Sequence, residues 1–207
     1  MNIFSNLRNK ELSDFLDKTL NNYYDKVITK NLSINLGKDS IELINANYKK
    51  AVSISVDFLG KEINSKIKSR LSGKKDIFGK LFPIKNSTLL DCTAGYGRDS
   101  YVLRSMGFNV TMIENSPVMS LLLNDALKKL KLLNFNMYHG NSYDYLNHSE
   151  KYYDYIYIDF MFNKLKKNSL SSKNDETLKL ISFQENDKNN LIRLAIKKSN
   201  HRVVVKE

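Results

Sequence analysis

The sequence is poor in the residues from which disulfides and many metal sites are built. It has one cysteine, Cys92, which excludes an internal disulfide and a site of several thiolates, and indicates a reducing compartment. Cys92 ends an apolar stretch, where a small buried thiol is expected rather than a nucleophile. The three histidines, His139, His148 and His201, show no ligand spacing, so we expect no bound metal.

Long hydrophobic runs are also missing. No apolar stretch approaches the roughly 20 residues that cross a bilayer. The segment from Met1 to Lys10 lacks the apolar centre of a signal peptide. We therefore expect a cytoplasmic, soluble protein with no membrane partner.

Positive charge, in contrast, is in excess. The 207 residues carry a formal net charge of +11. Because lysine and arginine release counterions from a phosphate backbone, this charge favours nucleic acid or an anionic surface as partner. A general drift of composition towards lysine and asparagine explains the charge equally well. The length suits one main domain with a small appendage.

Residues 1–86 are predicted to form that appendage, a small α/β subdomain with a basic linker. Apolar side chains recur at helical spacing over residues 11–24. Alternating patterns predict a hairpin from residues 32–36 and 41–44, and a further strand at 52–58.

The basic linker runs from Gly60 to Lys85. Its residues Lys66, Lys68 and Arg70 are candidates for contacts with the phosphates of a nucleic acid. A solvated helix face carries the same kind of charge, and that alternative stays open.

Residues 87–207 are predicted to form the second and larger domain. Strand and helix patterns alternate there, which indicates an α/β fold with a mostly parallel sheet and helices on both faces. The expected strands are 88–92, 109–113, 135–139, 155–158 and 201–206, and the expected helices are 97–106, 116–130 and 191–198.

A glycine turn follows the first of these strands. Gly95 and Gly97 allow the backbone to turn tightly and to approach a ligand without a Cβ in the way. A lone Gly-x-Gly is weak evidence, since an ordinary turn between strand and helix also uses it.

Polar residues follow four consecutive strands, at the edge where such sheets bind ligands. Glu114 suits the two ribose hydroxyls of an adenosine cofactor, and Asn141 and Ser142 suit an adenine edge. Arg98 and Asp99 begin a helix, where a cofactor carboxylate and ammonium would find partners. A cap or surface ion pair is the alternative for these two residues.

The fourth strand ends in Asp159, followed by Phe160, Met161 and Phe162. A base removed from its stack needs aromatic faces and a polar group at its edge, so Phe160 and Phe162 are candidate substrate-binding residues. Burial of both rings in the core is the alternative.

Taken together, these motifs resemble a known family, the bacterial 16S rRNA guanine-N2 methyltransferases called ribosomal small-subunit methyltransferase J. The resemblance implies a Rossmann-like class I methyltransferase that uses S-adenosylmethionine and acts on 16S rRNA or the small ribosomal subunit. Its cofactor contacts, carried onto matching positions, are Arg98, Asp99, Glu114, Asn115, Asn141, Ser142 and Asp159. The matching segments are Val56 to Gly60, Asp91 to Asp99, Ile113 to Val118, His139 to Ser142, Tyr157 to Phe162 and Arg202 to Lys206.

Two departures from the family's pattern stand out. The family has proline where this chain has Phe160 and again where it has Asn163, so the turn after the fourth strand is altered. The chain also ends at Glu207, where the family continues into a closing antiparallel hairpin, and we expect that hairpin to be absent.

The reaction implied by the resemblance is methyl transfer to the exocyclic N2 of guanine. Asp159 is the candidate catalytic residue, accepting a hydrogen bond from the amine while Phe162 stacks on the base. A nicotinamide-dependent enzyme is disfavoured because Ser100 replaces the third glycine of its motif. A non-catalytic RNA-binding or assembly factor on the same scaffold remains a second possibility.

Overall fold

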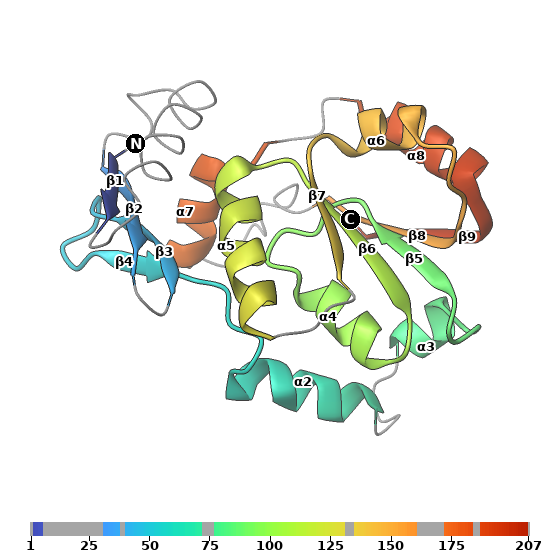
Figure 1. Ribbon diagram of the computed structural model, residues 1–207, viewed down its shortest axis with the longest axis horizontal. Coiled ribbons are helices and arrows are strands. Elements are labelled where there is room, and N and C mark those ends of the chain that lie inside the picture. Colours follow the sequence, from blue (N-terminus) through green and yellow to red (C-terminus); the bar gives the residue numbers. More distant parts are fainter. Residues whose placement is uncertain are drawn as a thin grey trace.

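The computed structural model describes residues 2–5, 31–37, 40–71, 77–130, 135–160, 172–183 and 187–206 (Figure 1). The helix predicted at 11–24 and the candidate Phe162 lie outside these residues. Within the described ranges, no helix has the length and apolar character needed to cross a bilayer.

The larger sheet has five parallel strands in the order β7-β6-β5-β8-β9. This confirms the predicted parallel α/β fold. The chain moves outward from β5 to β6 and β7, then crosses to β8 and β9 on the other side, so the strand order reverses between β5 and β8. The strands are β5 (Thr88–Asp91), β6 (Asn109–Glu114), β7 (Asn136–His139), β8 (Tyr153–Asp159) and β9 (Ser199–Lys206).

Helices cover both faces of this sheet (Figure 1). One face packs against α6 (Ser142–His148) and α8 (Lys188–Lys198) through a cluster that includes Leu146 and Leu191. The other face packs against α3 (Ile77–Leu81), α4 (Arg98–Ser105) and α5 (Pro117–Lys129). Apolar side chains on alternate strand positions supply both cores, as a sheet covered on two sides requires.

The start of α5 forms as its sequence predicts. The Ser116 hydroxyl accepts a hydrogen bond from the Met119 amide, and Pro117 occupies the first turn, where its missing N–H is not needed. This fixes the helix directly after β6, so the end of that strand and the helix start share one edge of the sheet.

Gly97 is needed for the turn and also for the packing of the core. It has φ +66°, and a Cβ there would lie 2.6 Å from Leu123 Cδ1 and 3.1 Å from Phe58 Cζ. The absent side chain therefore makes room for the apolar core under α5, and a cofactor contact at Gly97 stays a prediction. The same close packing is the usual role of a glycine between helix and sheet.

The smaller sheet has the order β1-β2-β3-β4. Its antiparallel hairpin of β2 (Leu32–Leu36) and β3 (Ile41–Asn45) confirms the predicted one. The next strand, β4 (Val52–Ile54), stops well before the predicted residue 58. At the other edge, β1 (Asn2–Ser5) pairs in parallel with β2, which the sequence analysis did not predict.

Helix α7 (Lys173–Ile181) returns from the second half of the chain to this smaller sheet. The buried Asn45 amide donates to the Thr177 hydroxyl over 2.8 Å, and the Tyr48 hydroxyl donates to the Glu176 carboxylate over 2.7 Å. One apolar cluster also includes residues of both sheets, such as Leu43 and Leu89. The division into domains at residue 87 stays a prediction.

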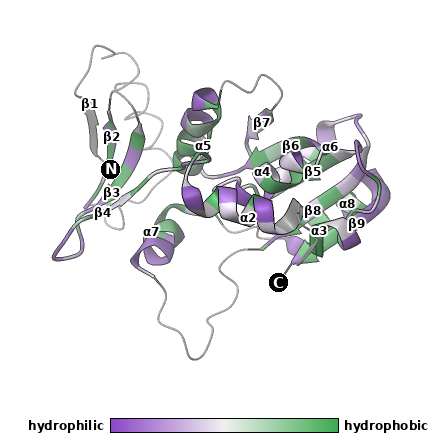
Figure 2. Cartoon of the chain, turned by 90° about the horizontal axis from the view of Figure 1, so that it is seen from below, coloured by the Kyte–Doolittle hydropathy of each residue, from purple (hydrophilic) through white to green (hydrophobic). Residues whose placement is uncertain are grey.

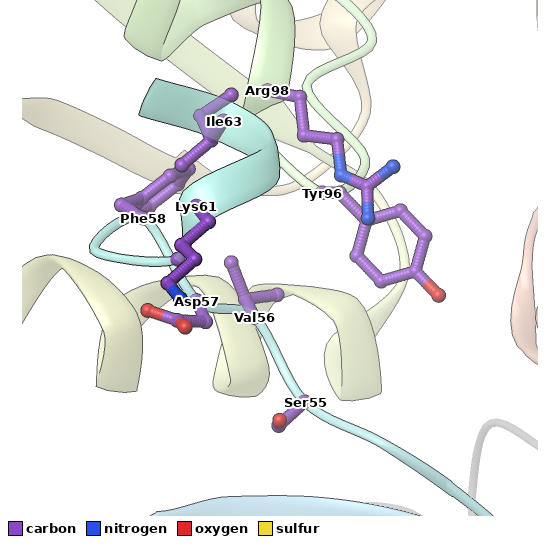
Figure 3. A pocket seen from close by; sticks show the side chains of 9 residues that line it. Ser55, Val56, Asp57, Phe58, Lys61, Ile63, Tyr96 and Arg98 are labelled. Atoms are coloured by element: carbon purple, nitrogen blue, oxygen red, sulfur yellow. The ribbon is translucent and has the colours of Figure 1, made fainter. Parts of the chain in front are cut away.

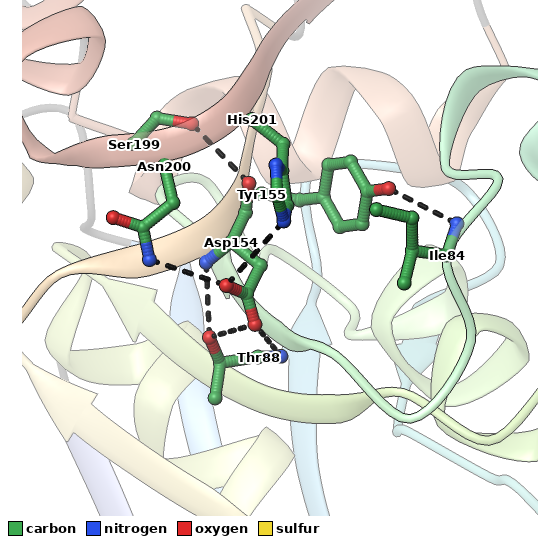
Figure 4. Close-up of polar contacts among 7 residues, drawn as sticks. All are labelled: Ile84, Thr88, Asp154, Tyr155, Ser199, Asn200 and His201. Carbon is green, nitrogen blue, oxygen red and sulfur yellow. Dashed lines mark hydrogen bonds and ion pairs between the residues drawn. The ribbon is translucent and has the colours of Figure 1, made fainter.

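At the amino end of β8, Asp154 joins three neighbouring strands (Figure 4). Its carboxylate accepts hydrogen bonds from the Thr88 amide at 2.8 Å and the Thr88 hydroxyl at 2.9 Å, and from the Asn200 amide at 3.2 Å. The hydrogen bond from the Thr88 amide, supported by the others, holds the pKa of Asp154 below its usual value. This acid fixes the sheet at the end opposite to the candidate site.

Candidate active site

A pocket of about 240 Å³ opens at the carboxyl ends of β5 and β8, where the strand order reverses. Ligands bind at this place in open parallel sheets. The pocket brings together Arg98, Asp99 and Asp159, three of the residues proposed from the sequence. Its full lining is Asp91, Thr93, Ala94, Tyr96, Arg98, Asp99, Tyr157, Asp159, Asp175, Leu178 and Lys206.

Asp91, at the end of β5, holds the turn from β5 to α4 by hydrogen bonds. Its carboxylate accepts hydrogen bonds from the Thr93 amide at 3.0 Å and from the Ser100 hydroxyl at 2.6 Å. The residue is 2% exposed. Burial raises the pKa of Asp91 to about 7, although these two hydrogen bonds oppose the rise.

Asp91 should therefore make stability depend on pH. Between its ordinary pKa and about 7, the unfolded chain loses the Asp91 proton while the folded protein keeps it, so stability falls as pH rises through this window. Asp91→Asn can keep both hydrogen bonds and cannot ionise. We expect its unfolding free energy relative to the parent to rise by about 2 kcal/mol between pH 5 and pH 7.

Urea unfolding of both proteins at the two pH values measures this difference. Asp144→Asn, which removes an exposed carboxylate on α6, controls for the loss of one negative charge. A parent-to-Asp91→Asn difference that is the same at both pH values would show that Asp91 does not ionise differently in the folded protein.

Glu114 holds the glycine turn from the neighbouring strand. Its Oε2 accepts a hydrogen bond from the Gly95 amide at 2.8 Å, and its Oε1 accepts one from the Ser116 amide at 2.7 Å. Burial raises the pKa of the Glu114 carboxyl, and the amide donors act against that rise. Glu114 thus shapes the turn and the start of α5, besides any contact with a ribose.

Asp159 is fixed by its backbone and by its side chain. Its amide donates to the Thr93 hydroxyl over 2.7 Å, and its Oδ2 accepts a hydrogen bond from Lys206 Nζ over 2.5 Å. The side chain is 14% exposed. The acid therefore keeps one orientation at the wall of the pocket.

Asp99 faces the same pocket from the first turn of α4. Its Oδ2 accepts a hydrogen bond from the Tyr157 hydroxyl over 2.8 Å and lies 3.6 Å from Lys206 Nζ. Sequence reasoning missed both partners. Lys206 ends the fifth strand of the same sheet edge, so extending the strand-end argument by one strand would have found it, whereas Tyr157 is indistinguishable from a core residue.

Asn141 and Ser142 lie at this edge but, although both are described, neither lines the pocket. Asn141 is the N-cap of α6, and its side chain accepts a hydrogen bond from the Asp144 amide at 3.1 Å. The buried Ser142 hydroxyl donates to the Cys92 carbonyl over 2.5 Å. These contacts tie the start of α6 to the end of β5. Cofactor contacts from Asn141, Ser142 and Asn115 stay predictions.

Phe160 lies in the core rather than on an open surface. It is 8% exposed, belongs to the apolar cluster under α8, and has Lys188 Nζ 5.0 Å from its ring centre. This placement favours the core alternative. A stacked base needs an open ring face, so the position of Phe160 does not support its predicted stacking on the substrate base.

Figure 3 shows a second pocket, with a volume of about 200 Å³. Tyr96 and Arg98 line both, and the Arg98 guanidinium lies 5.2 Å from the centre of the Tyr96 ring. Asp57, Phe58 and Lys61 form the opposite wall. The segment from Val56 to Gly60, one of the motifs identified in the sequence, thus lies beside the candidate site.

The basic candidates Lys66, Lys68 and Arg70 belong to α2 (Lys61–Leu71), which begins at this second pocket. The Lys68 side chain is exposed. Figure 2 shows hydrophilic residues along α2.

Among the residues that the structure describes, no group of three or more His, Cys, Asp or Glu side chains is arranged to hold a metal ion.

The fold and the site define a class I methyltransferase scaffold, a parallel sheet with a glycine turn after its central strand and acids at the following strand ends. The structure is similar to that of a SAM-dependent methyltransferase from Neisseria gonorrhoeae, with a TM-score of 0.60 and 23% identity. That similarity covers 84% of this chain and 70% of the other, and it concerns the fold alone.

The sequence comparisons identify the family. A family model described as "Putative SAM-dependent methyltransferase" matches residues 20–207. Two similar proteins are named ribosomal RNA small subunit methyltransferase J. The one from Buchnera aphidicola is 30% identical, and the match covers 100% of this chain and 87% of that protein. The one from Alteromonas mediterranea is 33% identical, and the match covers 79% of this chain and 67% of that protein. The chain belongs to the ribosomal RNA small subunit methyltransferase J family.

Coverage of relatives varies. A Coxiella burnetii protein of the same name is 39% identical over 125 residues, which is 58% of this chain and 49% of that protein. The chain thus spans about half the length of that relative.

The cofactor of the family is S-adenosylmethionine. Two pocket residues fit this cofactor, since Asp99 can receive its ammonium and Arg98 its carboxylate. Glu114 ends the neighbouring strand but does not line this pocket, so its ribose contact stays a prediction.

Proposed function

We propose that this chain transfers a methyl group from S-adenosylmethionine to the exocyclic N2 of a guanine in 16S rRNA. The observation that carries the proposal is the fixed position of Asp159, at the end of β8 in the same pocket as Asp99 and Arg98. The names of its relatives support the small ribosomal subunit as the substrate. A cytoplasmic location, where this RNA is made, follows from the proposal.

Positioning carries the chemistry in this mechanism. S-adenosylmethionine supplies a methyl group on a positively charged sulfur. The N2 lone pair of guanine is shared with the ring, so the amine is a poor nucleophile and must be held in line with the methyl group. Asp159 accepts a hydrogen bond from this amine, whose proton becomes more acidic as the new bond forms.

Transfer of tritium from labelled S-adenosylmethionine to small-subunit RNA tests the activity. Digestion of the RNA to nucleosides and mass spectrometry then identify the modified base and position. Label on N2-methylguanosine supports the proposal, and label on another base or position contradicts the assignment to N2. RNA binding without any transfer would instead favour the non-catalytic assembly factor.

Binding to RNA should depend on the basic residues of α2. If Lys66, Lys68 and Arg70 each neutralise a phosphate, replacing all three by alanine should flatten the plot of log affinity against log salt by roughly two to three units. Fluorescence anisotropy with a fragment of small-subunit RNA, over a series of potassium chloride concentrations, measures the slope. A triple variant at exposed Lys128, Lys129 and Lys151 controls for net charge, and equal slopes for both variants would count against the α2 surface.

A further inference from the structure

Lys206 is the last described residue of β9, and its ammonium lies between two carboxylates from other elements. Nζ donates a hydrogen bond to Asp159 Oδ2 on β8 over 2.5 Å, and it lies 3.6 Å from Asp99 Oδ2 on α4. The register of the sheet explains the meeting, because Asp159 and Lys206 are direct partners in the parallel β8–β9 pairing. Lys206 therefore contacts the two acids to which the proposed function assigns ligands.

The charges of the pocket make this contact consequential. Asp99, Asp159 and Asp175 line the pocket together with two cationic side chains, Arg98 and Lys206, and with the buried Asp91, whose pKa is raised to about 7. The Arg98 guanidinium lies against the Tyr96 ring, whereas Lys206 pairs with Asp159 and Asp99. Burial alone would lower the pKa of Lys206, but the hydrogen bond to Asp159 and the charge of Asp99 outweigh it, so the pKa is raised. Lys206 is a stable positive charge in this site.

We propose that Lys206 is a positioning residue that acts as an internal counter-cation, holding Asp159 in place and limiting the affinity of the pocket for a cationic ligand. The inference rests on the proposed function, in which that ligand is S-adenosylmethionine with its ammonium and sulfonium groups. The same two carboxylates would face those groups or the guanine amine. A ligand cation therefore competes with Lys206 for them.

Two opposite effects follow from removing this charge. The pocket of a Lys206→Met variant is more negative by one unit, so it should attract a positively charged ligand more strongly. Asp159 at the same time loses the partner that orients it, so methyl transfer should become slower. General loosening of the site would weaken both binding and transfer. Tighter binding together with slower transfer is thus specific to a counter-cation.

Calorimetric titration with S-adenosylmethionine and with S-adenosylhomocysteine tests the first effect without requiring activity. The second compound lacks the sulfonium charge. Because the Lys206 side chain is 58% exposed and partly screened by solvent, we expect Lys206→Met to bind S-adenosylmethionine roughly three- to tenfold more tightly. Binding of S-adenosylhomocysteine, which keeps the ammonium but lacks the sulfonium charge, should tighten less than binding of S-adenosylmethionine. The rate constant for methyl transfer at saturating substrates should fall about tenfold.

Two further variants control the interpretation. Lys206→Arg keeps the charge and should bind S-adenosylmethionine as the parent does. Lys129→Met removes a lysine that pairs with Asp125 on α5, away from the pocket, and should leave both affinities unchanged. Lys206→Gln is a second neutral variant should Lys206→Met fail to fold.

The outcomes separate this inference from the function on which it rests. Unchanged or weaker binding of S-adenosylmethionine by the neutral Lys206 variants, with normal binding by the parent, would overturn the counter-cation role. Equal tightening by Lys129→Met would overturn it as well, because the effect would then come from overall charge. Failure of the parent itself to bind S-adenosylmethionine would overturn the proposed function.

Discussion

Asp159→Asn should reduce methyl transfer to small-subunit RNA by about a hundredfold or more, the scale of a general base or key electrostatic group. The substitution keeps the size of the side chain and one acceptor oxygen, but it removes the negative charge. The backbone should stay in place because the Asp159 amide donates to the Thr93 hydroxyl. Affinity for S-adenosylmethionine should fall far less, since Asp159 would be one contact among several.

Tritium transfer at saturating cofactor measures this loss, and calorimetry measures the affinity. Asp154→Asn is a matched control, because it changes an aspartate at the opposite end of the same strand (Figure 4). That variant should lose stability through weaker bonds to Thr88 and keep its rate of methyl transfer below its melting temperature. Equal tritium incorporation by the parent and Asp159→Asn would discard the catalytic role of Asp159.

Glu114→Ala should weaken binding of S-adenosylmethionine by roughly ten- to a hundredfold, since hydrogen bonds to a charged acceptor contribute about 1.5 to 3 kcal/mol. The structure adds a second consequence of the same change. The amides of Gly95 and Ser116 would lose their acceptor, so the glycine turn should also become less stable. We expect the unfolding free energy to fall by about 1 to 3 kcal/mol.

Calorimetry at a temperature where circular dichroism shows the variant to be folded separates the two effects. Glu150→Ala, at an exposed position between α6 and β8, is the control for loss of a glutamate. If Glu114→Ala is less stable but binds the cofactor normally, then Glu114 only shapes the turn and the ribose contact is wrong.

The parallel sheet could be predicted because its strands are short apolar runs separated by turn and helix signals. Two helices, α6 and α7, could not be predicted from such local patterns. Helix α6 has seven residues, and its N-cap Asn141 was interpreted as a contact for adenine, although capping uses the same side-chain oxygen. Helix α7 buries Thr177, Leu178 and Ile181 against a sheet that is distant in sequence, and no local pattern reveals such a partner.

The candidate site was partly predictable for a similar reason. The carboxyl ends of parallel strands meet at one edge, so polar residues at those ends are brought together whatever the loops do. This correctly places Arg98, Asp99 and Asp159 in one pocket. Side-chain direction and depth were not predictable, because they depend on packing, and this is why Phe160 is buried and Gly97 makes room for Leu123.

The hydrogen bond between Asn45 and Thr177 also bears on how the chain matures on the ribosome. The two residues are 132 positions apart, and both side chains are buried. Domains commonly fold in order as they are synthesised, the N-terminal part first. Here the Asn45 amide in β3 gains its Thr177 partner, and the cover that buries it, only after α7 has been made. The first sheet to be made is therefore among the last parts to be completed, and a chain arrested before residue 173 would carry it unfinished.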